Sequence, residues 1–137
     1  MFDNYLTRWH LMPMASRLLP TAASLLPARH AGVPAMLKIA VEAEKKWGSA
    51  LMIWWDGNGA TRVLAHEGDA LLLERALGKS SLVEMARCGR DDEASRIICA
   101  VAAQLHARKD RPSPPALLPL SRWFEELDPA DVGMAAF

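Results

Sequence analysis

Cysteine is scarce in this chain, with only Cys88 and Cys99 among 137 residues. The two do not have the spacing of a metal site, and a chain of this length needs no covalent staple. We therefore expect reduced thiols, no metal site and a cytoplasmic location. No His or other base stands at helical spacing from Cys99, so the usual signature of an activated nucleophile is absent. We expect Cys99 to be a small buried hydrophobe.

An excess of either charge is also absent, because 16 Lys and Arg residues balance 16 Asp and Glu residues. This balance argues against the broad basic surface on which nucleic-acid and anionic-membrane binding usually relies. Long apolar runs are missing too. Charged residues and Pro13 interrupt the first 20 residues, which therefore predict neither a signal peptide nor a spanning helix. With 51% hydrophobic residues the chain can bury one core, so we expect one domain or part of one.

The clearest positive signal lies in residues 56–78. Short apolar runs at residues 61–65 and 70–73 flank the turn cluster His66-Glu67-Gly68-Asp69, and this pattern predicts a β-hairpin. Leucine occupies positions 71 to 73 without polar alternation, as in a strand that is covered on both faces. The run ends abruptly at Glu74, where a connector to the next part of the chain begins.

A lone lysine marks the best strand candidate before the hairpin, residues 35–41 (AMLKIAV). The period of two places Lys38 on the same face as Met36 and Ala40, among apolar neighbours. Two explanations stay open from the residues alone. Lys38 lies on an edge strand or extends its ammonium into water, or it belongs to an anion site, because an unpaired buried ammonium is costly.

An amphipathic helix is predicted between this strand and the hairpin. Apolar residues recur there at i, i+3, i+4 and i+7, namely Trp47, Ala50, Leu51 and Trp54. Glu42 and Glu44 stand in the first turn, where acids are favourable, and Asp56-Gly57 is a stop signal. The helix therefore returns the chain to the hairpin.

Weaker patterns cover the two ends of the chain. We expect strands at residues 9–12 and 24–29, with their pairing confined to edges or bends by prolines. After the hairpin, the capping-box spacing of Ser81 and Glu84 predicts a short helix that ends at Gly89. A longer helix starts at Asp91, with an apolar seam of Ala94, Ile97, Ile98, Val101 and Leu105. Residues 109–119 are proline-rich and predict an extended connector, and residues 121–127 predict a further helical turn or two.

The predicted order of elements is that of the small lobe of a protein-kinase-like fold entering its large lobe. From about Trp9 to Phe124 the chain resembles the bacterial aminoglycoside and hydroxyurea resistance kinases, in particular the streptomycin phosphotransferases. The segments that carry this resemblance are PAMLKIA (34–40), WWDGNGATRV (54–63), ALLLERA (70–76), DDEASRIICAVAAQLHA (91–107) and LLPLSRWF (117–124).

This resemblance implies an α+β fold with an antiparallel sheet of about five strands plus one helix, followed by the first helices of a large lobe. The implied small lobe covers residues 1–73. The implied hinge follows at residues 74–79. The start of the helical lobe covers residues 80–127, including the connector, and residues 128–137 form a loose tail.

The resemblance also implies roles for residues at matching positions. Lys38 matches the strand lysine that pairs with the nucleotide phosphates. In the family a helix glutamate orients this lysine. The matching position here holds Lys45, and the nearest acid is Glu44, one residue earlier. Glu44 is therefore the candidate ion-pair partner of Lys38. Glu74, Arg75 and Ala76 match the hinge, whose backbone reads the adenine edge.

Residues 16–24 stand where kinases place a glycine-rich cover over the phosphates. This loop contains no glycine. Arg17, Thr21 and Ser24 are its candidates for contact with phosphate, together with backbone N–H groups.

The kinase-type catalytic loop is missing from the sequence. No His-Gly-Asp occurs, and Asp110, Asp128 and Asp131 do not stand in a sequence motif with His or Asn, so we identify no catalytic residue and no metal ligand. The resemblance therefore implies the amino-terminal, nucleotide-binding portion of an ATP- and magnesium-dependent aminoglycoside (streptomycin-type) O-phosphotransferase, truncated before its catalytic loop and inactive alone. ATP is the expected partner, and an aminoglycoside only when the missing half is present.

Two other hypotheses stay open. One is a non-catalytic kinase-like interaction module that self-associates, or binds another protein, through the uncovered large-lobe face. Exposed Ile97, Ile98, Trp123 and Phe124 would form its apolar patch. The other is a generic α+β domain without a ligand site.

Overall fold

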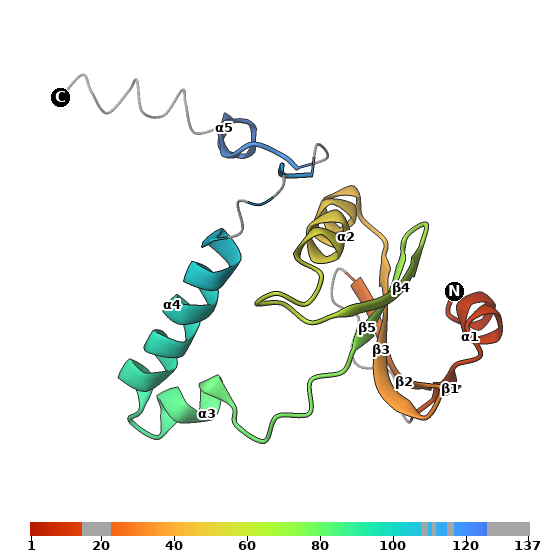
Figure 1. Cartoon of the computed structure of the whole chain (residues 1–137), viewed down its shortest axis with the longest axis horizontal. Coiled ribbons are helices and arrows are strands. Elements are labelled where there is room, and N and C mark those ends of the chain that lie inside the picture. Colours follow the sequence, from red (N-terminus) through yellow and green to blue (C-terminus); the bar gives the residue numbers. More distant parts are fainter. Residues whose placement is uncertain (15–22, 108–109, 111, 115–116, 126–137) are drawn as a thin grey trace.

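A computed structural model describes residues 1–14, 23–107, 110, 112–114 and 117–125. Figure 1 shows the order of its helices and strands: α1 (Asp3–Arg8), β1 (Met12–Pro13), β2 (Ala23–His30), β3 (Val33–Ala40), α2 (Ala43–Trp55), β4 (Val63–Glu67), β5 (Ala70–Glu74), α3 (Leu82–Arg87), α4 (Asp91–Ala107) and α5 (Leu120–Trp123). The α+β class is confirmed. Most of the predicted loop at residues 16–24 and the predicted tail at 128–137 lie outside the described residues.

The five strands form one antiparallel sheet in the order β1-β2-β3-β5-β4, as expected for a kinase-like small lobe. The predicted hairpin is confirmed, with a tighter turn than the sequence indicates. His66 and Glu67 continue the ladder by pairing with Leu71 and Ala70, so that only Gly68 and Asp69 remain between the strands. Gly68 has a φ of 54°, which glycine adopts at little steric cost.

The larger core lies on the face of the sheet that α1 covers. Leu37 of β3 and Leu72 of β5 are 0% exposed there. Phe2, Tyr5, Leu6 and Trp9 pack against this cluster from the amino-terminal helix and its end. The predicted strand at residues 9–12 is therefore wrong: Trp9 closes α1 against the core, and only Met12 and Pro13 pair with β2. Alternating apolar residues cannot by themselves distinguish a short strand from the end of an amphipathic helix.

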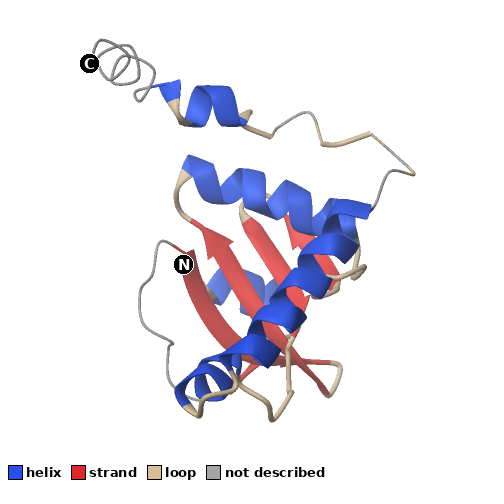
Figure 2. Ribbon diagram, turned by 90° about the vertical axis from the view of Figure 1, so that its left-hand side faces the viewer, coloured by secondary structure: helices blue, strands red, loops and turns tan. Residues whose placement is uncertain are grey.

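The opposite face of the sheet looks toward α2 and α4. Figure 1 places α1 on one side of the strands and these two helices on the other, and Figure 2 shows α4 crossing in front of the strands. The predicted stop of α2 is confirmed, because Asp56 caps the helix with a φ of 49° and Gly57 follows with a φ of 80°. An ion pair of 2.9 Å between Lys46 and Asp69 joins α2 to the β4–β5 turn.

The two helices after the sheet also form as predicted. The Ser81 hydroxyl accepts the Glu84 N–H at 3.3 Å and caps α3. Cys99 of α4 is exposed, so the prediction that it is buried is wrong. Five residues turn a helix by about 140°, which points Cys99 away from the side that buries Ala94 against α3.

Among the described residues, no helix combines the length and the apolar character that crossing a membrane would require.

Candidate functional site

Lys38 lies on the central strand of the sheet. β3 pairs with β2 on one side and β5 on the other, and the residues directly opposite Lys38 are Leu25 and Leu71. The explanation of Lys38 as an edge-strand residue is therefore wrong. Its neighbours in β3, Leu37 and Ile39, point into the core under α1, so Lys38 points to the face that looks toward α2 and α4.

The surroundings of Lys38 on this face are largely apolar. Residues directly opposite each other in an antiparallel pair share a face, so Leu25 and Leu71 flank the lysine. Leu71 is buried, Leu25 is half-buried and Lys38 itself is half-buried. The lysine ammonium is a compact point charge. Beside apolar side chains, water screens its attraction for an anion less than in bulk solvent, which favours contact with a phosphate oxygen.

Glu44, the predicted orienting acid, is the second residue of α2. This helix lies on the same side of the sheet as Lys38 (Figure 1). The side chains of Glu44 and Lys45 lie outside the described part of the structure, so the ion pair between Lys38 and Glu44 stays a prediction.

The structure does not bring Ser24 to Lys38. Ser24 of β2 stands directly opposite Ile39, and Ile39 belongs to the core under α1. The two residues therefore occupy opposite faces of the sheet. A phosphate contact by Arg17 or Thr21 falls outside the described residues.

The predicted hinge, residues 74–79, begins at Glu74, the last residue of β5, and its first backbone groups already have partners. The Glu74 N–H donates to the Arg62 carbonyl at 2.9 Å, and the Glu74 carbonyl accepts the Thr61 hydroxyl at 2.7 Å. The Arg75 N–H donates to the Pro34 carbonyl at 3.3 Å. Within the described residues, Ala76 is the first hinge position whose N–H has no backbone acceptor, and it is exposed.

Thr61 is a positioning residue that the sequence did not reveal. The sequence predicts it as the first residue of a strand, whereas β4 starts only at Val63. Its hydroxyl instead holds the carbonyl of Glu74, 13 positions further on. Thr61 and Glu74 come together because β4 pairs with β5, so the contact cannot be predicted from the local sequence.

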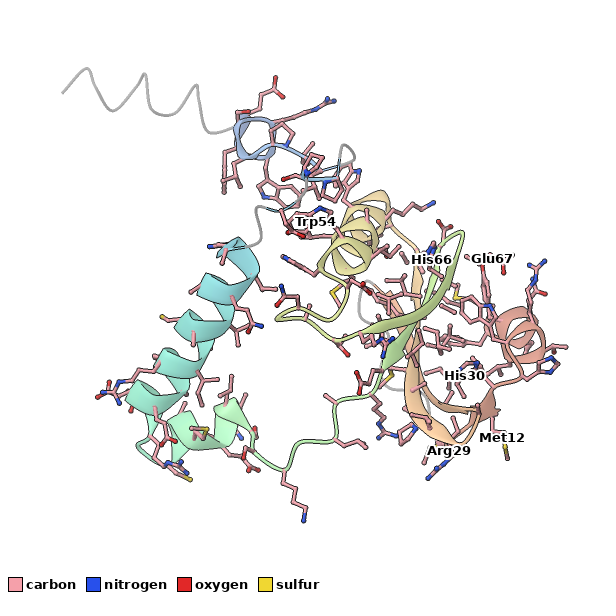
Figure 3. The ribbon with its side chains drawn as sticks, in the orientation of Figure 1. Met12, Arg29, His30, Trp54, His66 and Glu67 are labelled. Carbon is pink, nitrogen blue, oxygen red and sulfur yellow. The ribbon has the colours of Figure 1, made fainter. Side chains whose placement is uncertain are left out.

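A second connection joins the sheet half to the helical half, at the carboxyl end of α2. The Trp54 indole N–H donates to the Pro112 carbonyl at 2.8 Å, and the Trp55 indole N–H donates to the Leu105 carbonyl at 3.3 Å. Figure 3 shows Trp54 between α2 and the segment that leads to α5. Both bonds span at least 50 positions of sequence.

The loop after α2 completes this connection. The Gln104 amide donates to the Asn58 side-chain oxygen at 3.0 Å. Gly59 lies so close to α4 that a Cβ atom there would stand 3.1 Å from a Leu105 methyl group. We call residues 54, 55, 58, 59, 104, 105 and 112 the clasp. The clasp therefore joins the carboxyl end of α4 to the end of α2 and to the loop that follows α2.

A cavity of about 380 Å³ lies between α3 and α4. Met85 and Ile97 line its apolar part, and Lys79, Glu84 and Arg90 contribute charge. The cavity includes Lys79, the last residue of the predicted hinge, but not Lys38 or Ala76. It is therefore separate from the predicted nucleotide-binding residues.

Comparison with known proteins shows the family of the chain. A family model described as aminoglycoside/hydroxyurea antibiotic resistance kinase matches residues 8–135. The chain belongs to this family. A streptomycin 3''-kinase from Klebsiella pneumoniae is 45% identical over 122 residues, which cover 89% of this chain and 46% of that relative. The chain thus spans about half the length of the curated relative it matches. No solved structure gives a significant match.

Membership in the resistance-kinase family confirms the predicted resemblance. The matched residues, 8–135, include Lys38, the predicted hinge and the clasp. ATP and magnesium are general requirements of such kinases. Lys38 carries a cation of the kind that pairs with phosphate, and Ala76 carries an exposed N–H without a backbone acceptor, so the chemistry of both residues is compatible with a nucleotide. The described residues contain no group of three His, Cys, Asp or Glu side chains that would hold a metal. We therefore assign no magnesium ligand to them.

Proposed function

We propose that this chain is the nucleotide-binding portion of an ATP-dependent aminoglycoside O-phosphotransferase of the streptomycin type, a class that confers antibiotic resistance. The observation that carries this proposal is the placement of Lys38 on the central strand, on the face that looks toward α4. The matched relative is named a streptomycin 3''-kinase, and this match favours a streptomycin-like acceptor for the proposed enzyme. A kinase that uses ATP would act in the cytoplasm.

The register of β3 and β5 sets the spacing between the hinge and Lys38. Glu74 stands opposite Ala35, and Leu71 stands opposite Lys38. The three residues from position 35 to position 38 correspond to roughly 10 Å along the strand. In the proposed complex the adenine lies against the Arg75 carbonyl and the Ala76 N–H. The ribose then extends along the sheet and brings the phosphates to Lys38.

Catalysis requires more than this portion supplies. Kinase-type transfer depends on an aspartate at the acceptor hydroxyl and on magnesium ligands, and the sequence has no His-Gly-Asp motif. We therefore propose that residues 1–73 form the small lobe, 74–79 the hinge and 80–127 the start of the large lobe. Such a chain binds ATP without turning it over, and an aminoglycoside binds only when the catalytic half is present.

An ATP titration followed by isothermal calorimetry tests the proposal. We expect saturable binding by the unaltered chain and at least a tenfold weaker Kd in Lys38→Met, which keeps the length of the stem but removes the charge. Arg96→Ala removes an exposed cation of α4 and should leave the Kd unchanged. Equal affinity in all three chains, or no saturable binding by the unaltered chain, would contradict the proposal. Phosphate release above background by this chain would contradict the assignment of catalysis to a missing half.

A non-catalytic interaction module is the second candidate, and the exposed Ile97 and Ile98 favour it. Trp123 and Phe124 are exposed too, but they lie at the carboxyl end of α5 and just after it, and Figure 1 places α5 apart from the middle of α4. The predicted patch is therefore not continuous. Concentration-dependent dimerisation, without any effect of ATP on the melting temperature, would support this candidate over the first.

A further inference from the structure

The turn between β4 and β5 carries one acid for each of the two helices that flank the sheet. Glu67 forms an ion pair with Arg8 of α1, and Asp69 forms an ion pair of 2.9 Å with Lys46 of α2. Figure 1 places this turn between the two helices, and Figure 3 shows Glu67 on the side of α1. Of these two acids, Asp69 is therefore the one bound to the helix on the Lys38 side of the sheet.

Asp69 has a second contact, which it makes through its backbone. Its carbonyl oxygen accepts the N–H of Ala40 at 2.8 Å. Ala40 is buried, and it is the last residue of β3, two positions after Lys38. Asp69 thus holds the end of the lysine strand directly and the beginning of α2 through Lys46.

The beginning of α2 is not secured by its own cap. Its N-cap residue, Glu42, makes no side-chain capping hydrogen bond. Only Val41 and Glu42 separate the end of β3 from the helix. Lys46 is the fourth residue of α2, so its ion pair with Asp69 acts on the first turn of the helix.

The same turn carries position 44, which holds the candidate ion-pair partner of Lys38. Position 44 precedes Trp47 and Leu51 by three and seven residues, so it is in phase with these half-buried residues. Lys46 stands about 100° from Trp47, at the side of the helix. An ion pair at Lys46 therefore limits the rotation of the turn that carries position 44.

We propose that Asp69 is a positioning residue for the nucleotide site, because it holds the first turn of α2 at the height and rotation that place Glu44 near Lys38. The consequence for ATP rests on the proposed function, whereas the mechanism rests on the two contacts of Asp69. The side chains of Lys46 and Asp69 are 51% and 48% exposed, so their ion pair contributes little to overall stability. An effect of Asp69 on ATP affinity therefore reports the position of α2.

Calorimetric titration with ATP tests the proposal in two matched variants. Asp69→Asn removes the carboxylate charge and keeps the carbonyl that accepts from Ala40. Glu67→Gln removes the same charge two residues earlier, in a pair with Arg8 that is also about half exposed. From the strength of half-exposed ion pairs we expect Asp69→Asn to bind ATP about two- to fivefold more weakly than the unaltered chain. Glu67→Gln should bind as the unaltered chain does.

The sign of the effect separates positioning from net charge. Losing a negative charge would by itself favour an anion such as ATP, so weaker binding by Asp69→Asn cannot arise from net charge. The double variant Lys46→Asp with Asp69→Lys keeps the net charge, restores an opposite pair and should regain the Kd of the unaltered chain. In a Glu44→Gln background Asp69→Asn should have no further effect, because Asp69 acts through Glu44.

Hydrogen exchange measures the hold on α2 without nucleotide. Asp69→Asn should accelerate exchange of the backbone amides at residues 46–49 by about two- to fivefold, and Glu67→Gln should not. Equal exchange in the two variants would overturn the proposal, as would an ATP affinity that Asp69→Asn leaves unchanged. An unaltered chain that binds no ATP, with faster exchange only in Asp69→Asn, would contradict the proposed function but support the hold of Asp69 on α2. The two failures are therefore distinguishable.

Discussion

The indole N–H of Trp55 donates to the carbonyl oxygen of Leu105 across 50 positions of sequence. This bond joins the last residue of α2 to the last turn of α4. It lies beside the contact of Gly59 with Leu105 and the hydrogen bond between Asn58 and Gln104. The sheet half and the helical half of the chain are therefore connected twice, once by the hinge and once by these side chains.

Removing the Trp55 bond should loosen this connection. Trp55→Phe keeps most of the ring but leaves the Leu105 carbonyl without its donor, and we expect a loss of about 1 kcal/mol in the free energy of unfolding. Urea denaturation followed by circular dichroism measures it. Trp123→Phe, at an exposed position of α5, is the matched control and should change little. Equal effects of the two substitutions would show that the Trp55 bond contributes nothing.

Gly59 should not tolerate a side chain. Its φ of 78° disfavours other residues, and the added Cβ would stand 3.1 Å from Leu105 and 3.2 Å from Gln104. We expect Gly59→Ala to destabilise the chain by about 1–2 kcal/mol. Gly48→Ala is the opposite case, because no atom lies within 4 Å of its added Cβ and the residue is inside α2. That variant should gain about 0.5–1 kcal/mol, and thermal melting of both variants tests the difference in sign.

The Ser81 cap should matter for α3. Its hydroxyl accepts the Glu84 N–H, so Ser81→Ala leaves one more helix donor without a protein partner. We expect a cost of about 0.5–2 kcal/mol and faster hydrogen exchange in residues 82–87. Ser80→Ala, one residue earlier and exposed, should leave exchange unchanged. If Ser80→Ala accelerates exchange as much as Ser81→Ala does, the capping role is wrong.

The core under α1 should be sensitive to loss of volume. Leu72 is fully buried between strands and helix, so Leu72→Ala should cost about 2–5 kcal/mol through lost burial and a residual cavity. Val33→Ala removes apolar atoms at an exposed position and should cost less than about 0.5 kcal/mol. The midpoint of urea unfolding reports both. A small effect at Leu72 would mean that the packing of α1 contributes little to stability.

Elements with local signals were predictable from the sequence alone. The capping box at Ser81, the stop at Asp56-Gly57 and the glycine of the hairpin turn each depend on residues within a few positions of one another. The leucine run at 71–73 predicted a doubly covered strand, and all three side chains are buried. The segment around Lys38 and the WWDG string also sufficed to indicate the family, because such strings are specific without knowledge of the fold.

Tertiary structure decided what depends on distant partners. No local pattern could show that the strand of Lys38 is central, because strand order follows from the path of the whole chain. The same holds for Ser24, whose face is set by its register with Ile39. The partners of the Glu74 and Arg75 backbone are Thr61 and Arg62, just before β4, and Pro34 of β3, and these residues meet only in the folded sheet.

The sequence by itself determined the α+β class, the strand that carries Lys38, the hairpin and the two helices that follow the sheet, whereas the hinge and the second lobe stay predictions. Only the folded structure determined that Trp9 packs as the end of a helix, that Cys99 is exposed and that Trp55 reaches Leu105. The physical reason is that propensity and capping act over one or two turns. Burial and side-chain hydrogen bonds depend instead on which distant surfaces the fold brings into contact.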